Sequence, residues 1–177
     1  VKQVLVTGAN GQLGKSIKRI SPNFKGLKFV FTDKADLDIT NSEEVNTFFE
    51  SNALDYCINC AAYTSVDKAE EETDKAYLIN ATAVKNLAEA CKKSGAVLIH
   101  ISTDFVFDGT KRTPYTEEDT PNPLSVYGKS KLKGEEHVQE SCDRHFIVRT
   151  SWLYSEYGNN FVKTMLRLAE TRKQISV

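Results

Sequence analysis

The sequence lacks both an excess of one charge and any long apolar run. Its 23 Lys and Arg residues balance 24 Asp and Glu residues, for a net charge of -1. Nucleic-acid and membrane-surface binders usually carry an excess of positive charge, so we expect neither partner. The longest apolar runs, such as residues 96–101, are far shorter than the ~20 residues of a membrane-spanning helix. The N-terminus reaches Gly8 before the apolar core of a signal peptide could form, which predicts a cytoplasmic location.

Cysteine is also scarce. Four cysteines are too few and too dispersed for the disulfide scaffold of a small secreted protein. Cys57 and Cys60 form a C-x-x-C pair, but no second pair and no suitably spaced histidines complete a zinc site. We interpret the pair as small buried side chains at the end of a strand, and we predict no metal site.

Short apolar runs alternate with helical patterns along the whole chain, which is typical of β–α units wound into a parallel sheet. The runs predict strands at residues 3–6, 27–32, 56–58, 96–101 and 145–150. Helices are expected at about 12–20, from a cap at Thr40 or Asn41 to 51, and at 74–92, 125–140 and 161–171, with Ser125 capping the fourth. The sequence therefore predicts a Rossmann-like α/β domain over residues 1–177, a doubly wound and mainly parallel sheet with helices on both faces.

A glycine-rich turn joins the first predicted strand to the first predicted helix. Gly8 allows a tight turn, Gly11 lets the backbone approach a pyrophosphate, and Gly14 lets the helix pack close to the strand. The spacing is G-x-x-G-x-x-G, and the free N–H groups of the helix would face the phosphates. We therefore expect a dinucleotide to bind at this turn, which also contains Asn10, Gln12 and Leu13.

Asp33 and Lys34 follow the second predicted strand. The carboxylate of Asp33 is placed to accept hydrogen bonds from the adenosine ribose, which favours NADH. The ammonium of Lys34 would instead neutralise a 2′-phosphate, which favours NADPH. A solvated Asp–Lys pair in a turn remains the third interpretation.

Tyr127 and Lys131 lie four residues apart in a predicted helix, so both side chains lie on one helix face. A cation beside a phenol lowers the pKa of the phenol, which would make Tyr127 a usable general acid. Ser102 and Thr103 follow the apolar run 96–101, at the edge where doubly wound sheets bind ligands. A hydroxyl there could hydrogen-bond to a carbonyl that Tyr127 protonates.

In this chain order, the glycine turn, the hydroxyls and the Tyr/Lys pair resemble the extended short-chain dehydrogenase/reductases. The resemblance extends to residues 37–40, 61–70, 102–109, 123–135 and 149–154. It implies that the glycines hold the pyrophosphate, and that Thr103, Tyr127 and Lys131 are catalytic. Further cofactor contacts are implied for Asp38, Ile39, Ala61, Ala62 and Tyr63, and sugar-nucleotide contacts for Thr64, Val66, Asp104, Phe105 and Trp152. Asn80 either orders a water near the lysine or ties its helix to the sheet.

The function that the resemblance implies is reduction of the C4 ketone of dTDP-4-dehydro-L-rhamnose by NADPH or NADH. Phe105 stands where the family commonly has Tyr, so a hydroxyl contact to the sugar is expected to be missing. Ser16 stands where some members carry an acidic metal ligand, so that metal site is also expected to be missing. The family continues into a C-terminal substrate-binding lobe, so we expect these residues to be a domain truncated before that lobe. The resemblance is also compatible with a homodimer. The alternatives are a nucleotide-sugar epimerase or dehydratase of this fold, and a non-catalytic NAD(P)-binding regulatory subunit.

Overall fold

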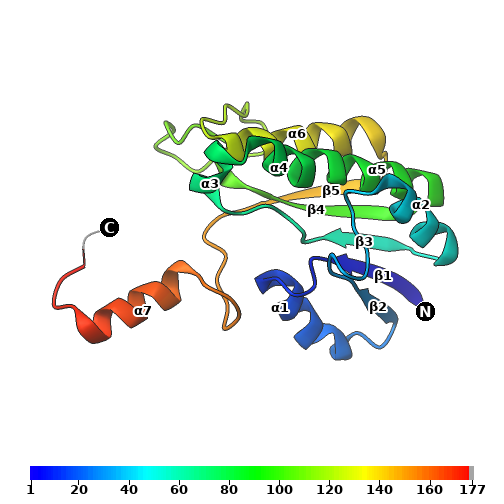
Figure 1. Ribbon diagram of the computed structural model, residues 1–177, viewed down its shortest axis with the longest axis horizontal. Coiled ribbons are helices and arrows are strands. Elements are labelled where there is room, and N and C mark those ends of the chain that lie inside the picture. Colours follow the sequence, from blue (N-terminus) through cyan, green and yellow to red (C-terminus); the bar gives the residue numbers. More distant parts are fainter. Residues whose placement is uncertain (176–177) are drawn as a thin grey trace.

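The computed structural model describes residues 1–175, and a parallel five-stranded sheet forms its centre (Figure 1). The strand order is β2-β1-β3-β4-β5, with every neighbouring pair parallel. The strands are β1 (Lys2–Thr7), β2 (Leu27–Phe31), β3 (Tyr56–Asn59), β4 (Val97–Thr103) and β5 (His145–Thr150). The strand order reverses at β1 and β3, so their carboxyl ends form the switch point where ligands of such sheets bind. The predicted fold class and all five predicted strands are confirmed.

Helices lie on both faces of this sheet (Figure 1). One face carries α1 (Gln12–Ile20), and the other carries α2 (Ser42–Ser51), α4 (Thr73–Tyr77), α5 (Ala83–Ser94) and α6 (Val126–Ser141). The short helix α3 (Val66–Glu71) follows β3, and α7 (Phe161–Thr171) lies apart from the sheet. Short 3₁₀ turns complete the set at η1 (Ser21–Asn23) and η3 (Asp104–Val106). No helix within residues 1–175 has both the length and the apolar character needed to cross a bilayer.

The core lies between the sheet and α5. Leu87 on α5 is fully buried and belongs to one apolar cluster with Leu5 on β1 and Leu98 on β4. Burying a leucine side chain stabilises a fold by about 1.5–3 kcal/mol, so this layer fixes the helix on the sheet. Cys57 is buried in the same cluster, whereas Cys60 is partly exposed, and all four cysteines are free thiols.

The single helix predicted over residues 74–92 is interrupted in the structure. A π-helical turn, η2 (Leu78–Thr82), separates α4 from α5. At this turn α6 comes very close, because a Cβ at Gly134 would lie 2.1 Å from the backbone oxygen of Asn80. A π turn leaves no trace in the 3.6-residue hydrophobic pattern, and such turns are frequent at functional sites.

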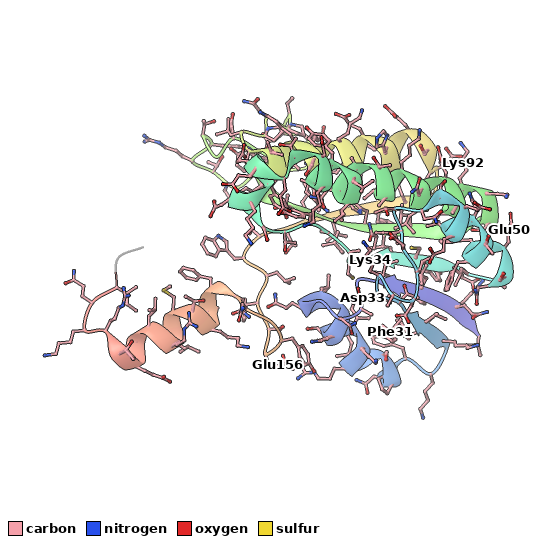
Figure 2. The ribbon with its side chains drawn as sticks, in the orientation of Figure 1. Phe31, Asp33, Lys34, Glu50, Lys92 and Glu156 are labelled. Atoms are coloured by element: carbon pink, nitrogen blue, oxygen red, sulfur yellow. The ribbon has the colours of Figure 1, made fainter. Side chains whose placement is uncertain are left out.

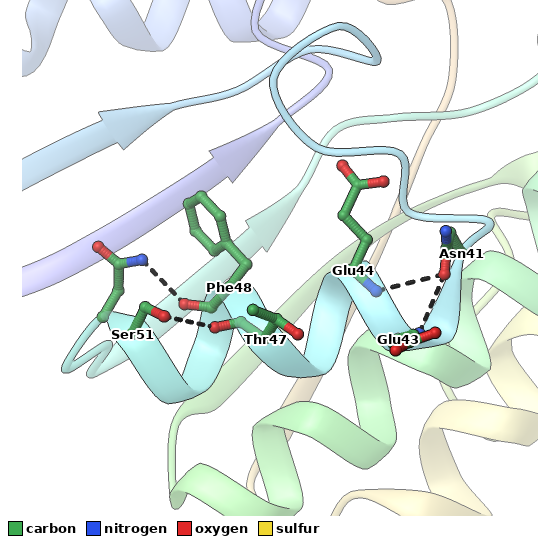
Figure 3. A pocket seen from close by; sticks show the side chains of 7 residues that line it. Asn41, Glu43, Glu44, Thr47, Phe48 and Ser51 are labelled. Carbon is green, nitrogen blue, oxygen red and sulfur yellow. Dashed lines mark hydrogen bonds between the residues drawn. The ribbon is translucent and has the colours of Figure 1, made fainter.

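Side-chain caps fix where two of the predicted helices begin. The Asn41 side chain accepts hydrogen bonds from the backbone N–H groups of Glu43 and Glu44, so Asn41, and not Thr40, is the N-cap of α2 (Figure 3). Ser125 caps α6 as expected, accepting from the N–H of Gly128 at 3.1 Å. The hollow drawn in Figure 3 runs along α2 and shares no residue with the cavities described below. The sequence of residues 174–177 resembles the opening of a further strand, but residues 174 and 175 form none, and residues 176 and 177 lie outside the described residues.

Candidate functional site

Two cavities lie side by side at the carboxyl edge of the sheet. The first, of about 300 Å³, lies over the ends of β1 and β2, and the second, of about 500 Å³, lies over the end of β4 and the start of α6. Gly11, Cys60 and Ala62 line both of them. The glycine turn and the Tyr/Lys pair, which are more than 100 residues apart in the sequence, therefore border one continuous cleft.

Two positions of the glycine turn leave no space for a side chain, and one of them also has a backbone conformation that favours glycine. Gly8 has a φ of +63°, and a Cβ there would lie 2.7 Å from the backbone nitrogen of Ala61. A Cβ at Gly14 would lie 2.5 Å from the carbonyl oxygen of Gly8. Gly11 precedes α1, and no side chain caps that helix. The first backbone N–H groups of α1 are therefore available to phosphate oxygens, so the turn fits a dinucleotide.

Polar groups line the β2 side of the first cavity, and Figure 2 shows Asp33 and Lys34 where the chain leaves β2. The carboxylate of Asp33 accepts from the N–H groups of Asn10, at 3.1 Å, and Lys34, at 2.7 Å. Hydrogen bonds from Thr40, aided by the Lys34 ammonium 3.7 Å away, lower the pKa of Asp38. The buried hydroxyl of Thr32 has no hydrogen-bond partner within residues 1–175. An unpaired buried hydroxyl in the wall of a cavity fits a polar ligand there.

Tyr127 and Thr103 face the second cavity. The Tyr127 ring is 9% exposed and packs edge-on against Phe105, with ring centroids 5.5 Å apart. Burial raises the pKa of the Tyr127 phenol, and the Asp104 charge adds to this, while the Thr103 hydroxyl opposes it. The Thr103 hydroxyl itself donates to Asp104 Oδ1 at 3.1 Å. Tyr127 is therefore held as a neutral phenol, the form that can give up a proton.

Lys131 is 2% exposed and belongs to the same cavity wall. Its Nζ donates to the carbonyl oxygen of Ile101 at 2.7 Å and lies 3.4 Å from His100 Nε2. Burial lowers the pKa of Lys131 to about 8, against the opposing effects of Glu135 and Cys60. The expectation that Lys131 lowers the pKa of Tyr127 is not met here, because burial of the phenol dominates and raises that pKa.

A buried ion pair stands behind Lys131. Glu135 lies one helical turn further along α6 and is 1% exposed. Its carboxylate accepts hydrogen bonds from Nε and one Nη of Arg149 on β5. It also accepts from the hydroxyl of Ser102, the residue before Thr103. Sequence reasoning missed Glu135 and Arg149, although the four-residue spacing from Lys131 to Glu135 places both on one face of the helix.

The predicted sugar-contacting residues all line the second cavity: Thr64, Val66, Thr103, Asp104, Phe105, Tyr127 and Trp152. Trp152 is 69% exposed and has a φ of +53°, and its ring packs edge-on against Phe161 on α7. Trp152 is therefore part of the cavity wall and not of the buried core.

Most predicted cofactor residues also line the cleft: Gly8, Gly11, Gln12, Leu13, Asp33, Lys34, Asp38, Ile39, Ala61, Ala62 and Lys131. Asn80 does not, because its side chain is fully buried and bonds to both backbone polar groups of Tyr63 and to Ser130. Of its two expected roles, Asn80 therefore serves to tie elements together. Asn10, Gly14 and Tyr63 line neither cavity.

Sequence reasoning missed several lining residues of the cleft. They are Thr7, Thr32, Leu37, Thr40, Cys60 and Ile79 in the first cavity, and Thr150, Ser151, Leu153 and Asn159 in the second. The available signal was position, since Thr7, Thr32 and Thr150 end or directly follow a strand. Within residues 1–175, no three His, Cys, Asp or Glu side chains are grouped so as to hold a metal ion.

Residues 2–177 match the family described as RmlD substrate binding domain. The chain is similar to the dTDP-4-dehydrorhamnose reductase of Aggregatibacter actinomycetemcomitans, at 46% identity over 99% of this chain and 60% of that protein. It is similar to the enzyme of the same name from Escherichia coli strain K12, at 44% identity over 98% of this chain and 59% of the other. The chain thus spans about 60% of the length of these relatives.

Solved structures show the same similarity. A dTDP-4-dehydrorhamnose reductase from Clostridium acetobutylicum superposes with a TM-score of 0.93 at 50% identity, covering 98% of this chain and 61% of that one. One from Bacillus anthracis, in complex with NADP, gives 0.94 at 48% identity, covering 99% and 62%. The UDP-glucose 4-epimerase of Brucella ovis, at 23% identity and a TM-score of 0.76 over 84% and 51%, shares the fold alone. This chain belongs to the family of the RmlD substrate binding domain.

Proposed function

We propose that the full-length protein reduces the C4 ketone of dTDP-4-dehydro-L-rhamnose to dTDP-L-rhamnose, with NADPH or NADH as the hydride donor. The observation that carries this proposal is the continuous cleft, which has a phosphate-binding turn at one end and Thr103, Tyr127 and Lys131 at the other. The names of the relatives support the sugar, and the NADP in the Bacillus anthracis structure supports the cofactor. Because those relatives are longer, part of the surface that selects the sugar is expected outside these residues.

In the proposed reaction, one end of the cleft holds the cofactor and the other end donates the proton. The glycine turn and the start of α1 hold the pyrophosphate, and Asp33, Lys34 and Asp38 surround the adenosine end. When bound, the reduced nicotinamide supplies the hydride for the carbonyl carbon. Tyr127 transfers its phenolic proton from Oη to the carbonyl oxygen, for which a raised pKa keeps it protonated.

Thr103 and Lys131 prepare this proton transfer. The Thr103 hydroxyl turns from Asp104 to the substrate carbonyl and polarises it. Lys131 lies one turn beyond Tyr127 on α6, where its ammonium would hold the nicotinamide ribose and stabilise the tyrosinate that remains after transfer. Burial of both side chains excludes water and strengthens these electrostatic effects.

Replacement of Tyr127 by Phe tests the proton donor. In the full-length protein we expect Tyr127→Phe to lower kcat by about 10²–10⁴-fold, the usual contribution of a general acid, while the Kd for NADPH changes little. Tyr154→Phe is the matched control, because Tyr154 is 66% exposed and lines neither cavity. Undiminished turnover of Tyr127→Phe would remove Tyr127 from the mechanism.

Cofactor stoichiometry separates the proposed reductase from the two alternatives. A reductase oxidises one NADPH per ketosugar reduced, whereas an epimerase or dehydratase returns its cofactor to the starting state. A regulatory subunit would bind cofactor and oxidise none. We therefore expect the absorbance of NADPH to fall in proportion to added dTDP-4-dehydro-L-rhamnose, and a constant absorbance would overturn the proposal.

A further inference from the structure

A chain of buried polar side chains crosses the sheet from the glycine turn to Lys131, and the proposed reaction makes no use of it. Thr7, Asn59 and His100 are direct register partners on the neighbouring strands β1, β3 and β4. Each is no more than 1% exposed. Burying polar groups in the centre of a sheet is costly unless their hydrogen bonds are matched in donor and acceptor.

The orientation of the Asn59 amide is fixed by a backbone group. Asn59 Oδ1 accepts from the hydroxyl of Thr7 at 2.7 Å and from the backbone N–H of Ala61 at 3.1 Å. A backbone N–H can only donate, so the oxygen of the amide must lie on that side. The amide nitrogen, Nδ2, therefore faces His100 Nδ1 at 3.1 Å and donates to it.

This contact determines where the proton of His100 lies. Burial, aided by the charge of Lys131, holds the pKa of His100 well below its ordinary value, so the ring is neutral. A neutral imidazole has one N–H, and Nδ1 accepts from Asn59, so the hydrogen is on Nε2. That N–H faces Lys131 Nζ at 3.4 Å.

We propose that His100 is a positioning residue for Lys131: its Nε2–H faces Nζ, so it stabilises the amine form, disfavours the ammonium form, and thereby sets the pH at which Lys131 loses its charge. An amine has one lone pair and two hydrogens, so it satisfies both contacts at once. An ammonium has no lone pair and would set two donors against each other. The consequence for catalysis rests on the proposed function, whereas the tautomer of His100 and the titration of Lys131 do not.

The other groups around Lys131 agree with this assignment. The titratable side chains facing it are His100 on β4, Cys60 after β3, and Glu135 on its own helix α6. Glu135 is occupied by Ser102 and Arg149, and Cys60 is kept as a thiol because burial raises its pKa to about 12. Burial independently lowers the pKa of Lys131 to about 8. His100 therefore tunes the pH at which Lys131 loses its charge.

The tautomer is tested directly on the full-length protein labelled with ¹⁵N-histidine. Long-range ¹H–¹⁵N NMR spectra at pH 7 distinguish a protonated Nε2 with a bare Nδ1 from the opposite tautomer and from imidazolium. The His100 signal is the one missing from His100→Asn. We expect a protonated Nε2, and either of the other two patterns would overturn the proposal.

The effect on Lys131 is tested by its titration, followed by ¹³C NMR of the lysine ε-carbons and assigned with Lys131→Met. His100→Asn keeps an acceptor for Asn59 but removes the N–H that faces Lys131. We expect the pKa of Lys131 to rise by about one unit, the size of one hydrogen bond. His137→Asn is the matched control, since His137 on α6 lies outside this chain of side chains and should leave the titration unchanged.

These tests can fail independently of the proposed function. An unchanged Lys131 titration in folded His100→Asn would contradict the role of His100. If that variant does not fold, the tautomer measured in the wild type is the test of that role. In an active enzyme, the basic limb of the kcat/KM profile should move to higher pH with the Lys131 titration. A protein with the expected tautomer and titration that oxidises no NADPH would refute the proposed function and leave His100 in its role.

Discussion

The two cavities of the cleft are built from different parts of the chain. At the glycine turn the backbone forms the binding surface. Residues 8 and 14 must be glycine there, because neighbouring backbone atoms occupy the space of a Cβ. At the Tyr/Lys end, buried side chains form the surface, and Lys131, Glu135 and His100 are each no more than 2% exposed.

This difference makes the two regions sensitive to different changes. A backbone surface tolerates no added atom but depends little on pH. A surface of buried ionisable groups is sensitive to the loss of a partner and to proton concentration, because unpaired buried charges are expensive. The largest expected effects therefore lie at the Tyr/Lys end, and the smallest lie among the exposed charges beside the glycine turn.

Loss of Glu135 should have the largest effect. Glu135→Ala leaves the Arg149 guanidinium without its carboxylate, and removal of one partner from a buried ion pair costs about 3–5 kcal/mol. We expect the lower end of that range because the Arg149 side chain is 24% exposed and can reach water. Urea unfolding measures the loss. Glu50→Ala, which breaks an exposed pair with Lys93, should cost less than about 1 kcal/mol, and equal losses would contradict the comparison.

Lys131 should make folding stability depend on pH in the alkaline range. Its pKa falls from 10.5 in the unfolded chain to about 8 in the folded one, so between these values the unfolded chain holds more protons. Stability contributed by this group therefore rises with pH from about 8 to 10.5, by about 3 kcal/mol. The unfolding free energy of Lys131→Met, subtracted from that of the wild type at each pH, isolates this slope. A flat difference would show that Lys131 has an ordinary pKa.

Gly14→Ala should damage the backbone-built end. Its Cβ would lie 2.5 Å from the Gly8 carbonyl oxygen and 2.6 Å from the Ala9 Cα, so the turn must shift. Overpacking of this kind costs about 1–3 kcal/mol, and the displaced turn should bind NADPH at least about tenfold more weakly. Gly26→Ala is the control, because nothing lies within 4 Å of its Cβ. Fluorescence titration with NADPH distinguishes the two, and unchanged affinity in Gly14→Ala would mean that the turn does not hold the cofactor.

The backbone-built end is largely predictable from the sequence, and the side-chain end is not. Glycines at fixed spacing between a strand and a helix indicate a turn, so the sequence pattern alone locates Gly8, Gly11 and Gly14. The expected direction of the Tyr127 pKa shift is wrong, because helix spacing reports which side chains share a face and says nothing of burial. The hydrogen bond between Asn59 and His100 could not be predicted either, because the two residues come from different strands and only the parallel register brings them together.

Lys34 should have the smallest effect on stability and still change cofactor choice. Its side chain is 82% exposed and 3.7 Å from Asp38, so Lys34→Ala should change the unfolding free energy by less than about 0.5 kcal/mol. If its ammonium neutralises a 2′-phosphate, the Kd for NADPH rises several-fold while that for NADH stays constant. Asp33→Ala is the informative partner, because loss of that carboxylate should weaken NADH and spare NADPH. Parallel changes for both cofactors in both variants would assign the pair to the solvated turn, and the choice of cofactor would then rest on groups other than Asp33 and Lys34.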